Sequence, residues 1–543
     1  TCNIMAASIN SIDRFPTTNN DLVEVGNRIF LCRNTGSLIL ELEVNGTHFP
    51  SLSGNYNFAF SVFECTNIFG KSGSIFIDYA DGTGEHEYPF KESTDFKMRL
   101  AKTANNQLPP NPTRADYSEI GFYNYPIYFF DDIDPSVPID DNYPVTRKIK
   151  IRFPRFQDLL IFNLRYTGLL GELPSAIGRF RNLDSLSIFR SENLDSLGSD
   201  FDKVFCKNLT LGGLGFSFSV GIPEFILNSN SLEYVNLNSA VTLSGTNSES
   251  KLDRFFSNEL PNLNGFDLSS TKIDTRIPDF HKDITGEIGF SGQNTSGFLF
   301  SNNLSNWKGS LSISNSTSLP DSEIVRVLED SSITSFNAVS NSFNLDIITT
   351  EINTTIRLLI LGRGDSFGGS LPSFLGNLTA LDSLYFGDFG NGQDFPQLKF
   401  YGNNPLPNSL SHLQLSKNTD LEVTVPTWFG TLNLNRFQSW SWQTQSRINT
   451  HVENFYSVVE STNAMTGSTY LRGLDYQLVN TNLNLNTNPR PSGTYEAPTG
   501  YIQGSANGTP TSPMQAIYVL VNQYNMTVTV LNELGNGKDI YTP

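Results

Sequence analysis

The sequence predicts a β-rich α/β solenoid, flanked by an N-terminal β-sandwich-like module and a small C-terminal α/β module. Three observations lead to this fold class. An apolar pattern returns about every 25 residues between residues 156 and 445. A proline occupies a fixed phase of many of these cycles, and the first 100 residues alternate apolar and polar side chains with period two.

The composition agrees with a globular, β-rich chain and excludes one class of partner. Charged residues make up only 17% of the 543 residues, while Asn, Ser, Thr and Gly, which favour turns and strand surfaces, are frequent. The formal net charge of −18 repels a phosphate backbone, so we expect no nucleic-acid partner. No apolar run is long enough to span a bilayer, so we expect no membrane insertion.

Residues 1–100 are predicted to form an antiparallel β module. The segment SLILELEV alternates strictly, and NYNFAFSVF and GSIFIDYADGTGEHEYPF follow with the same pattern. The last segment resembles the polycystic-kidney-disease type of β-sandwich, with Ala80 replacing the usual glycine. The residues that carry this resemblance are Tyr79, Asp81, Gly82, Thr83 and Tyr88. Such modules are spacers on extracellular bacterial proteins.

Residues 101–155 are predicted to be an ordered connection that caps the first repeats. The segment YNYPIYFFDDIDPSVPIDDNYP is too apolar for a free linker, and VTRKIKIRF reads as its closing strand. The aspartates of this segment could supply oxygen ligands to calcium, although their spacing fits no EF-hand loop, and a solvated acidic loop is the alternative. They are Asp131, Asp132, Asp134, Asp140 and Asp141.

Residues 156–445 carry the repeat, in which each cycle holds a strand of the form apolar-x-x-apolar-x-apolar. The clearest strands read LLIFNL, LDSLSI, LEYVNL, LNGFDL, IRLLIL, LDSLYF, LSHLQL and FQSWSW. Neither the strand nor its return segment can bury the apolar face alone, so we expect about twelve stacked turns to share one core.

A proline after many strands supports the same phase. Proline cannot donate to a β ladder, and it fits the first residue of a return helix. The prolines at this phase are Pro174, Pro223, Pro278, Pro320, Pro372, Pro396 and Pro426. The period and the pieces GELPSAIG and GGSLPSFLG resemble the leucine-rich-repeat family, in its variant with a Gly-x-Leu/Ile-Pro turn. That variant occurs in plant-type repeats and in bacterial and phage proteins.

The polar positions between the inward apolar ones predict a binding face. In LDSLSI, for example, Leu183, Leu186 and Ile188 are expected to point inward and the intervening residues outward. A ladder of such polar and aromatic groups is the usual binding face of a solenoid, and a merely solvated face is the alternative. The candidate ligand-binding residues are Asp184, Ser185, Ser187, Glu233, Tyr234, Asn236, Asp382, Ser383, Tyr385, Ser411, His412 and Gln414.

Residues 446–543 are predicted to form a C-terminal α/β cap and terminal module. Val452, Phe455, Val458 and Val459 follow helical spacing and could seal the solenoid end. Further on, Ser512 is placed as the N-cap of a second helix. In that helix Pro513 takes the first position, and Met514, Ile517 and Val521 share one face.

The sequence predicts neither catalysis nor metal binding. It contains no H-E-x-x-H pair, and we expect no catalytic residues, no metal site and no cofactor. Carboxylate pairs that hydrolyse glycosides meet only in the fold, so a surface glycosidase stays open. Cys2, Cys32, Cys65 and Cys206 form no C-x-x-C pair; a disulfide among the first three and buried thiols are both compatible with their spacing.

The resemblance implies a non-enzymatic adhesion protein. The C-terminal segment from Arg472 through PSGTYEAPTGYIQGSANGTPTSPMQAIYVLVNQYNMTVTV is similar to a terminal module of Bacteroidetes phage and prophage proteins. We therefore expect a tail- or fibre-associated virion protein, in a homo-oligomer or a larger assembly, that binds a protein or carbohydrate on the host surface or a neighbouring virion protein. The alternative is a secreted or cell-surface bacterial adhesin. The N-terminal segment TCNIMAASINSIDRF lacks the features of a signal peptide, and a removed leader stays open.

Overall fold

The computed structural model describes the chain from residue 169 onward with short gaps, and only isolated strands before that point. The described residues are 3–6, 22–25, 28–33, 38–45, 62–67, 73–78, 84–90, 99–100, 117–118, 127–128, 146–153, 159–165, 169–180, 183–191, 194–214, 218, 221–244, 246–257, 259–339, 348, 352–362, 373–386, 406–416, 425–440, 445–466, 470–480, 490–532 and 539–543. The aspartates of the acidic loop and four of the five residues of the polycystic-kidney-disease resemblance, all but Tyr88, lie outside this set.

The chain divides into two compact units. Unit 1 comprises Thr1–Thr103 and Leu108–Phe266, and unit 2 comprises Ala104–Gln107 and Asp267–Pro543. Strand β18 (Gly265–Asp267) spans the boundary. The division falls inside the repeat region, at neither end of the expected solenoid, because the first repeats share their sheets with N-terminal strands.

Unit 1 contains a parallel sheet extended by strands of the N-terminal region. The parallel strands are β12 (Leu159–Arg165), β14 (Leu183–Ser191), β16 (Cys206–Leu214) and β17 (Tyr234–Asn236). Strand β5 (Val62–Asn67) pairs antiparallel with β12, and β10 (Ile127–Tyr128) pairs antiparallel with β5. The first repeat strand is therefore covered at its edge by a strand that precedes it in the chain.

The other strands of unit 1 form smaller sheets. A four-stranded antiparallel sheet has the order β4 (Leu38–Asn45), β11 (Thr146–Phe153), β6 (Gly73–Asp78), β7 (Glu85–Phe90). The segment VTRKIKIRF thus pairs with the N-terminal strands. The remaining strands are β1 (Asn3–Ala6), β2 (Leu22–Val25), β3 (Arg28–Arg33), β8 (Arg99–Leu100), β9 (Tyr117–Ser118), β13 (Gly171–Glu172) and β15 (Leu194–Ser196).

Unit 2 contains a long run of parallel strands in register. They are β19 (Glu287–Gly289), β20 (Ser310–Ser312), β21 (Ser335–Val339), β22 (Leu358–Gly362), β23 (Ser383–Phe386), β24 (His412–Ser416), β25 (Arg436–Trp440), β26 (Asp475–Asn480) and β27 (Thr527–Asn532). Antiparallel β28 (Asp539–Tyr541) pairs with β27. The expected solenoid of parallel strands is confirmed.

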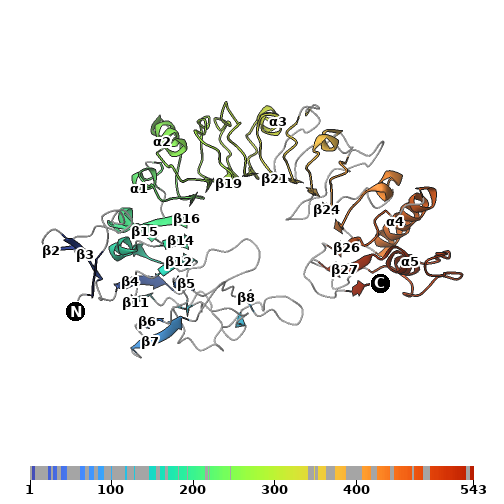
Figure 1. Cartoon of the computed structure of the whole chain (residues 1–543), viewed down its shortest axis with the longest axis horizontal. Helices are drawn as coiled ribbons and strands as arrows, with labels where there is room; N and C mark the ends of the chain where they lie inside the picture. Colours follow the sequence, from blue (N-terminus) through green and yellow to red (C-terminus); the bar gives the residue numbers. More distant parts are fainter. Residues whose placement is uncertain are drawn as a thin grey trace. The chain divides into compact units, whose positions relative to one another are not determined.

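Helices and short turns return the chain on one side of the strands within each unit (Figure 1). Prolines 174, 223, 320 and 426 stand directly before four of them, as the repeat phase predicts. The return segments are η5 (Ser175–Arg179), η6 (Phe201–Lys203), α1 (Glu224–Leu227) and α2 (Thr246–Phe256) in unit 1, and α3 (Asp321–Asp330), η8 (Ser373–Asn377), η10 (Thr427–Thr431), α4 (Gln445–Thr466) and α5 (Pro513–Tyr524) in unit 2.

The core lies between the strands and these return segments. Leu186 and Ile188, expected to point inward, are fully buried, as are Leu384 and Leu413 at the same positions of later repeats. Each fully buried side chain of this size contributes about 1.5 to 3 kcal/mol to folding. Cys206, at the start of β16, belongs to this core as a free thiol, and burial raises its pKa to about 12.

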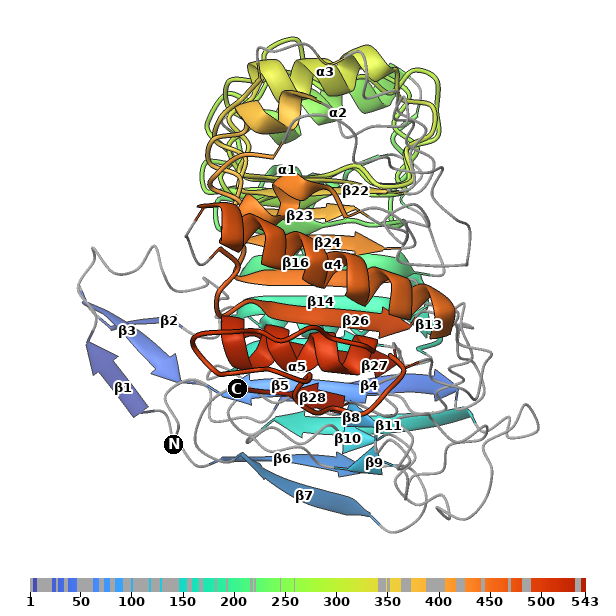
Figure 2. The same cartoon turned by 90° about the vertical axis from the view of Figure 1, so that its right-hand side faces the viewer.

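The two longest return helices cover the last parallel strands (Figure 2). Helix α4 buries Val452, Phe455 and Val459, as expected, and the Phe455 ring lies 4.4 Å from the ring of Tyr476 in β26. The side chain of Ser512 caps α5 by accepting from the backbone nitrogen of Gln515, which confirms the expected N-cap. Parallel pairing therefore continues past residue 445, since α4 and α5 serve as enlarged return segments.

Candidate functional site

The predicted site residues lie on the face of the sheet opposite the return segments, here called the open face. Within each unit the strand register arranges them in three rows, and unit 1 and unit 2 each hold six of the twelve. The edge row, at the start of the strands, holds Asp184, the second residue of β14, and Glu233, Asp382 and Ser411, which directly precede β17, β23 and β24. The first row holds Ser185, Tyr234, Ser383 and His412, and the second row holds Ser187, Asn236, Tyr385 and Gln414.

Most of these side chains are exposed or half-buried, but two are not. Ser187 is 0% exposed and Gln414 is 5% exposed. The expectation that they project into solvent is therefore wrong for both. Both residues occupy the second row, and in the register Ser187 lies between Asn163 and Thr210. Side chains on the neighbouring strands cover a residue in the middle of a strand more than one at its end.

In unit 1 the edge row carries alternating charges. Lys207 Nζ lies 3.2 Å from an Asp184 carboxylate oxygen, and the next residue in the row is Glu233. Hydrogen bonding to Asp184, with the charges of Asp184 and Glu233, raises the pKa of Lys207. Both partners of this pair are about half exposed, so it orders the surface and adds little to stability.

On β19, β20 and β21 of unit 2, serine side chains recur on the open face, beside Glu287 and Asn337. We call the residues at and directly after these strands the serine face: Ser291, Ser310, Ser312, Ser314 and Ser335. The hydroxyls of Ser291 and Ser312 are 2.9 Å apart, and Ser314 donates to the Asn337 side-chain oxygen over 3.0 Å. These groups use their hydrogen-bonding capacity largely on each other.

On β23 to β26, long polar side chains line the same face. We call this set the amide–ion face: Asp382, Ser411, His412, Arg436, Gln438, Asp475 and Gln477. Gln438 donates to Gln477 over 2.6 Å, Gln477 donates to Asp475 over 2.7 Å, and Arg436 Nε lies 3.2 Å from Asp475. This chain of bonds links β25 to β26.

Ser411, His412 and Asp382 meet at one end of the amide–ion face. The Ser411 hydroxyl donates to Asp382 over 2.5 Å and lies 2.6 Å from His412 Nδ1. Because the serine has one proton and gives it to the carboxylate, Nδ1 must be the donor toward the serine oxygen. The Ser411 hydroxyl holds the pKa of Asp382 below its ordinary value, with a smaller contribution from Ser383.

This trio does not form a nucleophilic triad. In a triad the histidine contacts serine through one ring nitrogen and aspartate through the other, and it accepts the serine proton. Here the same nitrogen, Nδ1, lies 2.6 Å from the serine and 3.7 Å from the aspartate. The arrangement fixes side-chain positions and does not activate Ser411 as a nucleophile.

Four residues of the amide–ion face were not predicted from the sequence: Arg436, Gln438, Asp475 and Gln477. FQSWSW was recognised as a repeat strand, and its intervening Gln438 could have been found from that register. Asp475 and Gln477 follow the long helix α4, which lengthens the repeat so that Gln438 and Gln477 lie 39 residues apart. No constant period would have placed them on the same face.

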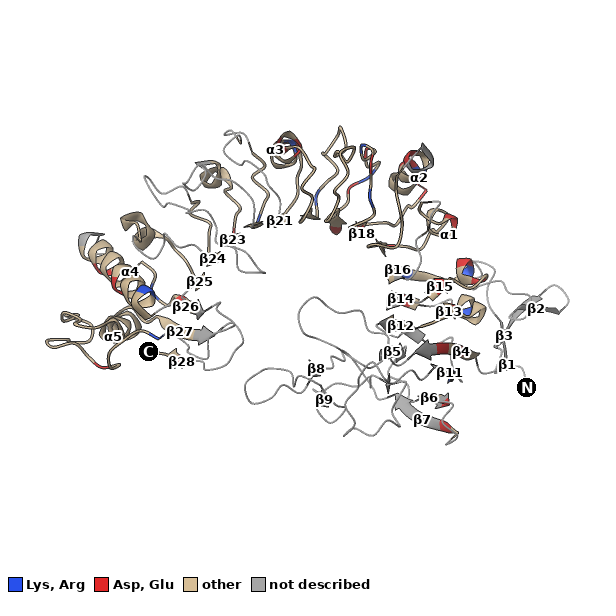
Figure 3. Ribbon diagram, turned by 180° about the vertical axis from the view of Figure 1, so that it is seen from behind, with Lys and Arg blue, Asp and Glu red and all other residues tan. Residues whose placement is uncertain are grey.

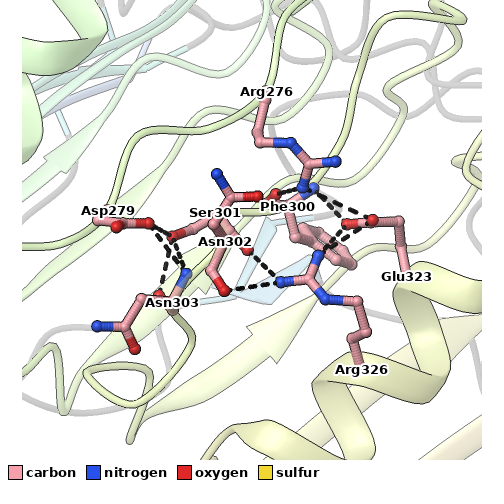
Figure 4. Close-up of polar contacts among 8 residues, drawn as sticks. All are labelled: Arg276, Asp279, Phe300, Ser301, Asn302, Asn303, Glu323 and Arg326. Atoms are coloured by element: carbon pink, nitrogen blue, oxygen red, sulfur yellow. Dashed lines mark hydrogen bonds and ion pairs between the residues drawn. The ribbon is translucent and has the colours of Figure 1, made fainter.

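A second polar cluster, around Glu323 of α3, is structural (Figure 4). The Glu323 side chain is 7% exposed, accepts a 2.8 Å hydrogen bond from the Phe300 backbone nitrogen, and contacts Arg326 at 3.1 Å and Arg276 at 3.7 Å. Arg326 also donates to the carbonyls of Ser301 and Asn302, and Arg276 to that of Phe300. The cluster ties successive return segments together.

In the described part of the chain, no group of three or more His, Cys, Asp or Glu side chains could hold a metal ion. No helix among the described residues is both long enough and apolar enough to cross a membrane.

Comparison with known proteins finds similarity at the level of structure only. No protein-family model and no curated protein sequence matches the chain. An internalin, inlF, from Listeria monocytogenes is 13% identical with a TM-score of 0.28, and the match covers 59% of this chain and 86% of that one. The PEPR1-AtPEP1 structure is 16% identical with a TM-score of 0.27, over 60% of this chain and 45% of that one. At these TM-scores the description of the fold rests on the in-register sheet.

Proposed function

We propose that the protein is a non-enzymatic binding protein that engages a protein or carbohydrate surface through its open face. The observation that carries the proposal is the amide–ion face, where the three consecutive strands β24, β25 and β26 present polar side chains in register. Amide, guanidinium, imidazole and carboxylate groups together offer donors and acceptors to a polar surface. Arg436, His412 and Asp382 are each more than one third exposed, so they are accessible to a partner.

Charge favours a polar, uncharged ligand on this face. Asp382 and Asp475 flank His412 and Arg436, so the face combines both signs within a chain of net charge −18. Glycans and polypeptide backbones match such a mixed set of donors and acceptors, whereas polyanions do not. The orientation of the Ser411 proton toward Asp382 also supports binding over hydrolysis.

We further propose that this binding serves adhesion on the virion of a Bacteroidetes phage, in a tail- or fibre-associated position. The similarity of the C-terminal segment to phage and prophage proteins supports this location. A secreted or cell-surface bacterial adhesin is the alternative and uses the same face. Electron microscopy of the native source material separates the two, since symmetric copies on a particle support the virion and localisation in the cell envelope supports the adhesin.

Binding itself is tested with the purified chain on glycan and peptide arrays and on fixed candidate host cells. Arg436→Ala combined with Gln438→Ala should reduce the signal at least tenfold, because the substitutions remove the exposed donors of two rows. Ser312→Ala on the serine face is the matched control and should bind as the parent protein does. Equal binding by the double variant would contradict the proposal, and hydrolysis of an arrayed glycan would favour a glycosidase.

A further inference from the structure

The C-terminal part of unit 2 contains a long stretch of sequence without charged residues. Although 17% of the chain is charged, no charged residue occurs from Ala497 to Asn532. This stretch includes the turn before α5, all of α5 and all of β27. Figure 3 accordingly draws α5 and the turn before it almost wholly in tan. The net charge of −18 makes most of the protein surface acidic, so this uncharged stretch stands apart from the rest of the chain.

Four tyrosine rings cluster at this stretch: Tyr501 and Tyr518 within it, and Tyr495 and Tyr541 just outside it. The rings of Tyr495 and Tyr518 lie 5.2 Å apart, those of Tyr501 and Tyr518 5.4 Å, and those of Tyr495 and Tyr541 4.7 Å. All four side chains are half-buried, so part of each ring is packed within the protein and part is exposed to solvent. Charge-depleted surfaces enriched in tyrosine are typical of the centre of protein interfaces.

A hydrogen-bonded turn carries an exposed aliphatic side chain directly after Tyr501 in the sequence. Ile502 is 60% exposed, although its backbone is fixed by hydrogen bonds of 2.7 and 2.8 Å with Ala506. The tip of the turn is held to α5, where Gln523 accepts from the Gly504 backbone nitrogen over 3.0 Å. A side chain held in place before binding loses little conformational entropy on binding, so Ile502 is suited to be an anchor.

The border of this surface carries one ion pair and one further carboxylate. Arg490 and Asp539 form an ion pair of 3.0 Å beside Tyr541. Glu496 lies on the other side and accepts from Gln515 over 3.4 Å. Two copies of this chain repel each other over most of their surface, and they repel least where a neutral patch of one meets the same patch of the other.

We propose that this surface, formed by Tyr495, Tyr501, Ile502, Tyr518 and Tyr541, pairs two copies of the chain in a two-fold contact. Ile502 of each copy packs among the tyrosine rings of the other, and the open face stays outside the contact. The dimer strengthens as salt screens the like charge of the two copies, whereas a contact built on ion pairs would weaken.

Sedimentation equilibrium of the full chain at concentrations from about 1 to 200 μM tests the proposal. A concentration-dependent dimer is expected, with a dissociation constant raised at least tenfold by Ile502→Asp. Ile39→Asp is the matched control, because Ile39 is 52% exposed in β4 of unit 1 and should leave the dimer unchanged. Circular dichroism verifies that each variant folds.

Three results would overturn the proposal. The parent chain could remain monomeric up to 200 μM in 0.5 M salt. The dimer could persist unchanged in Ile502→Asp. The control Ile39→Asp could weaken the dimer as much as Ile502→Asp does, which would indicate general apolar association. Array binding through the open face should be the same for Ile502→Asp and the parent, so this test is independent of the proposed function.

Discussion

The serine face and the amide–ion face occupy equivalent positions of the same sheet in unit 2 but differ in what they leave available. Hydroxyls on the serine face reach one another, as those of Ser291 and Ser312 do, and the Ser291 backbone nitrogen donates over 3.0 Å to the hydroxyl of Ser269 in the preceding repeat. On the amide–ion face the side chains are longer and carry more polar atoms than their neighbours can satisfy. Side-chain length therefore separates a surface that stabilises the stack from one that can bind.

The backbone differs in the same way. At Gly309, before β20, a Cβ atom would overlap the carbonyl oxygen of Gly286 in the preceding repeat. The repeats of the serine face are thus packed through close backbone contact. On the amide–ion face, long side chains bridge neighbouring strands, as Gln438 and Gln477 do. The four predictions below test this contrast, from the largest expected effect to the smallest.

Gly309→Ala should lower the free energy of unfolding of unit 2 by about 3 kcal/mol, because the added methyl group has to displace backbone. Urea denaturation followed by tryptophan fluorescence measures this, since all four tryptophans of the chain belong to unit 2. Ser310→Ala, one residue along, should change the value by less than about 0.5 kcal/mol. Similar small effects for both variants would refute the close backbone packing.

Glu323→Ala should destabilise unit 2 by about 2 kcal/mol, because Arg276 and Arg326 lose their shared partner and the Phe300 nitrogen loses its acceptor. The same fluorescence-detected urea titration measures the loss. Asp330→Ala removes an exposed carboxylate at the end of the same helix and serves as the control. An equal shift for the two variants would mean that Glu323 acts only through net charge.

Arg436→Ala should change stability by less than about 0.5 kcal/mol, because Arg436 and Asp475 are both more than one third exposed. Its binding to the arrays of the proposed function should nevertheless fall. Measuring both quantities on one preparation separates recognition from folding. A stability loss as large as that of Glu323→Ala would mean that the amide–ion face, like the cluster around Glu323, mainly stabilises the fold.

Asp382 should give the smallest effect, visible only in acid. Since its folded-state pKa lies below the ordinary value, its contribution to stability is present above about pH 4 and is lost as the pH falls through the folded value. The urea midpoint of the parent should therefore exceed that of Asp382→Asn at pH 6, and the gap should close toward pH 2. A gap that stays constant with pH would contradict the role of the Ser411 hydrogen bond.

The strands and their inward-pointing residues could be predicted from the sequence, because the repeated apolar positions all lie on one face of each strand and that face must be buried. Leu186, Ile188 and the helix residue Phe455 are buried where the pattern puts them. The sequence was not sufficient for Ser187 or Asp475. Burial of Ser187 depends on neighbouring strands, and the place of Asp475 depends on the length of α4, which the period does not encode.

The buried thiol of Cys206 can report how often unit 1 opens locally. With a pKa of about 12 almost none of it is thiolate near neutrality, whereas an exposed cysteine titrates near 8.5 and reacts readily with disulfide reagents. In a chain whose other three cysteines are changed to serine, the rate of labelling at Cys206 would count how often the strands around β16 part. Local unfolding of the core around β16 can thus be measured with a residue that the protein already contains.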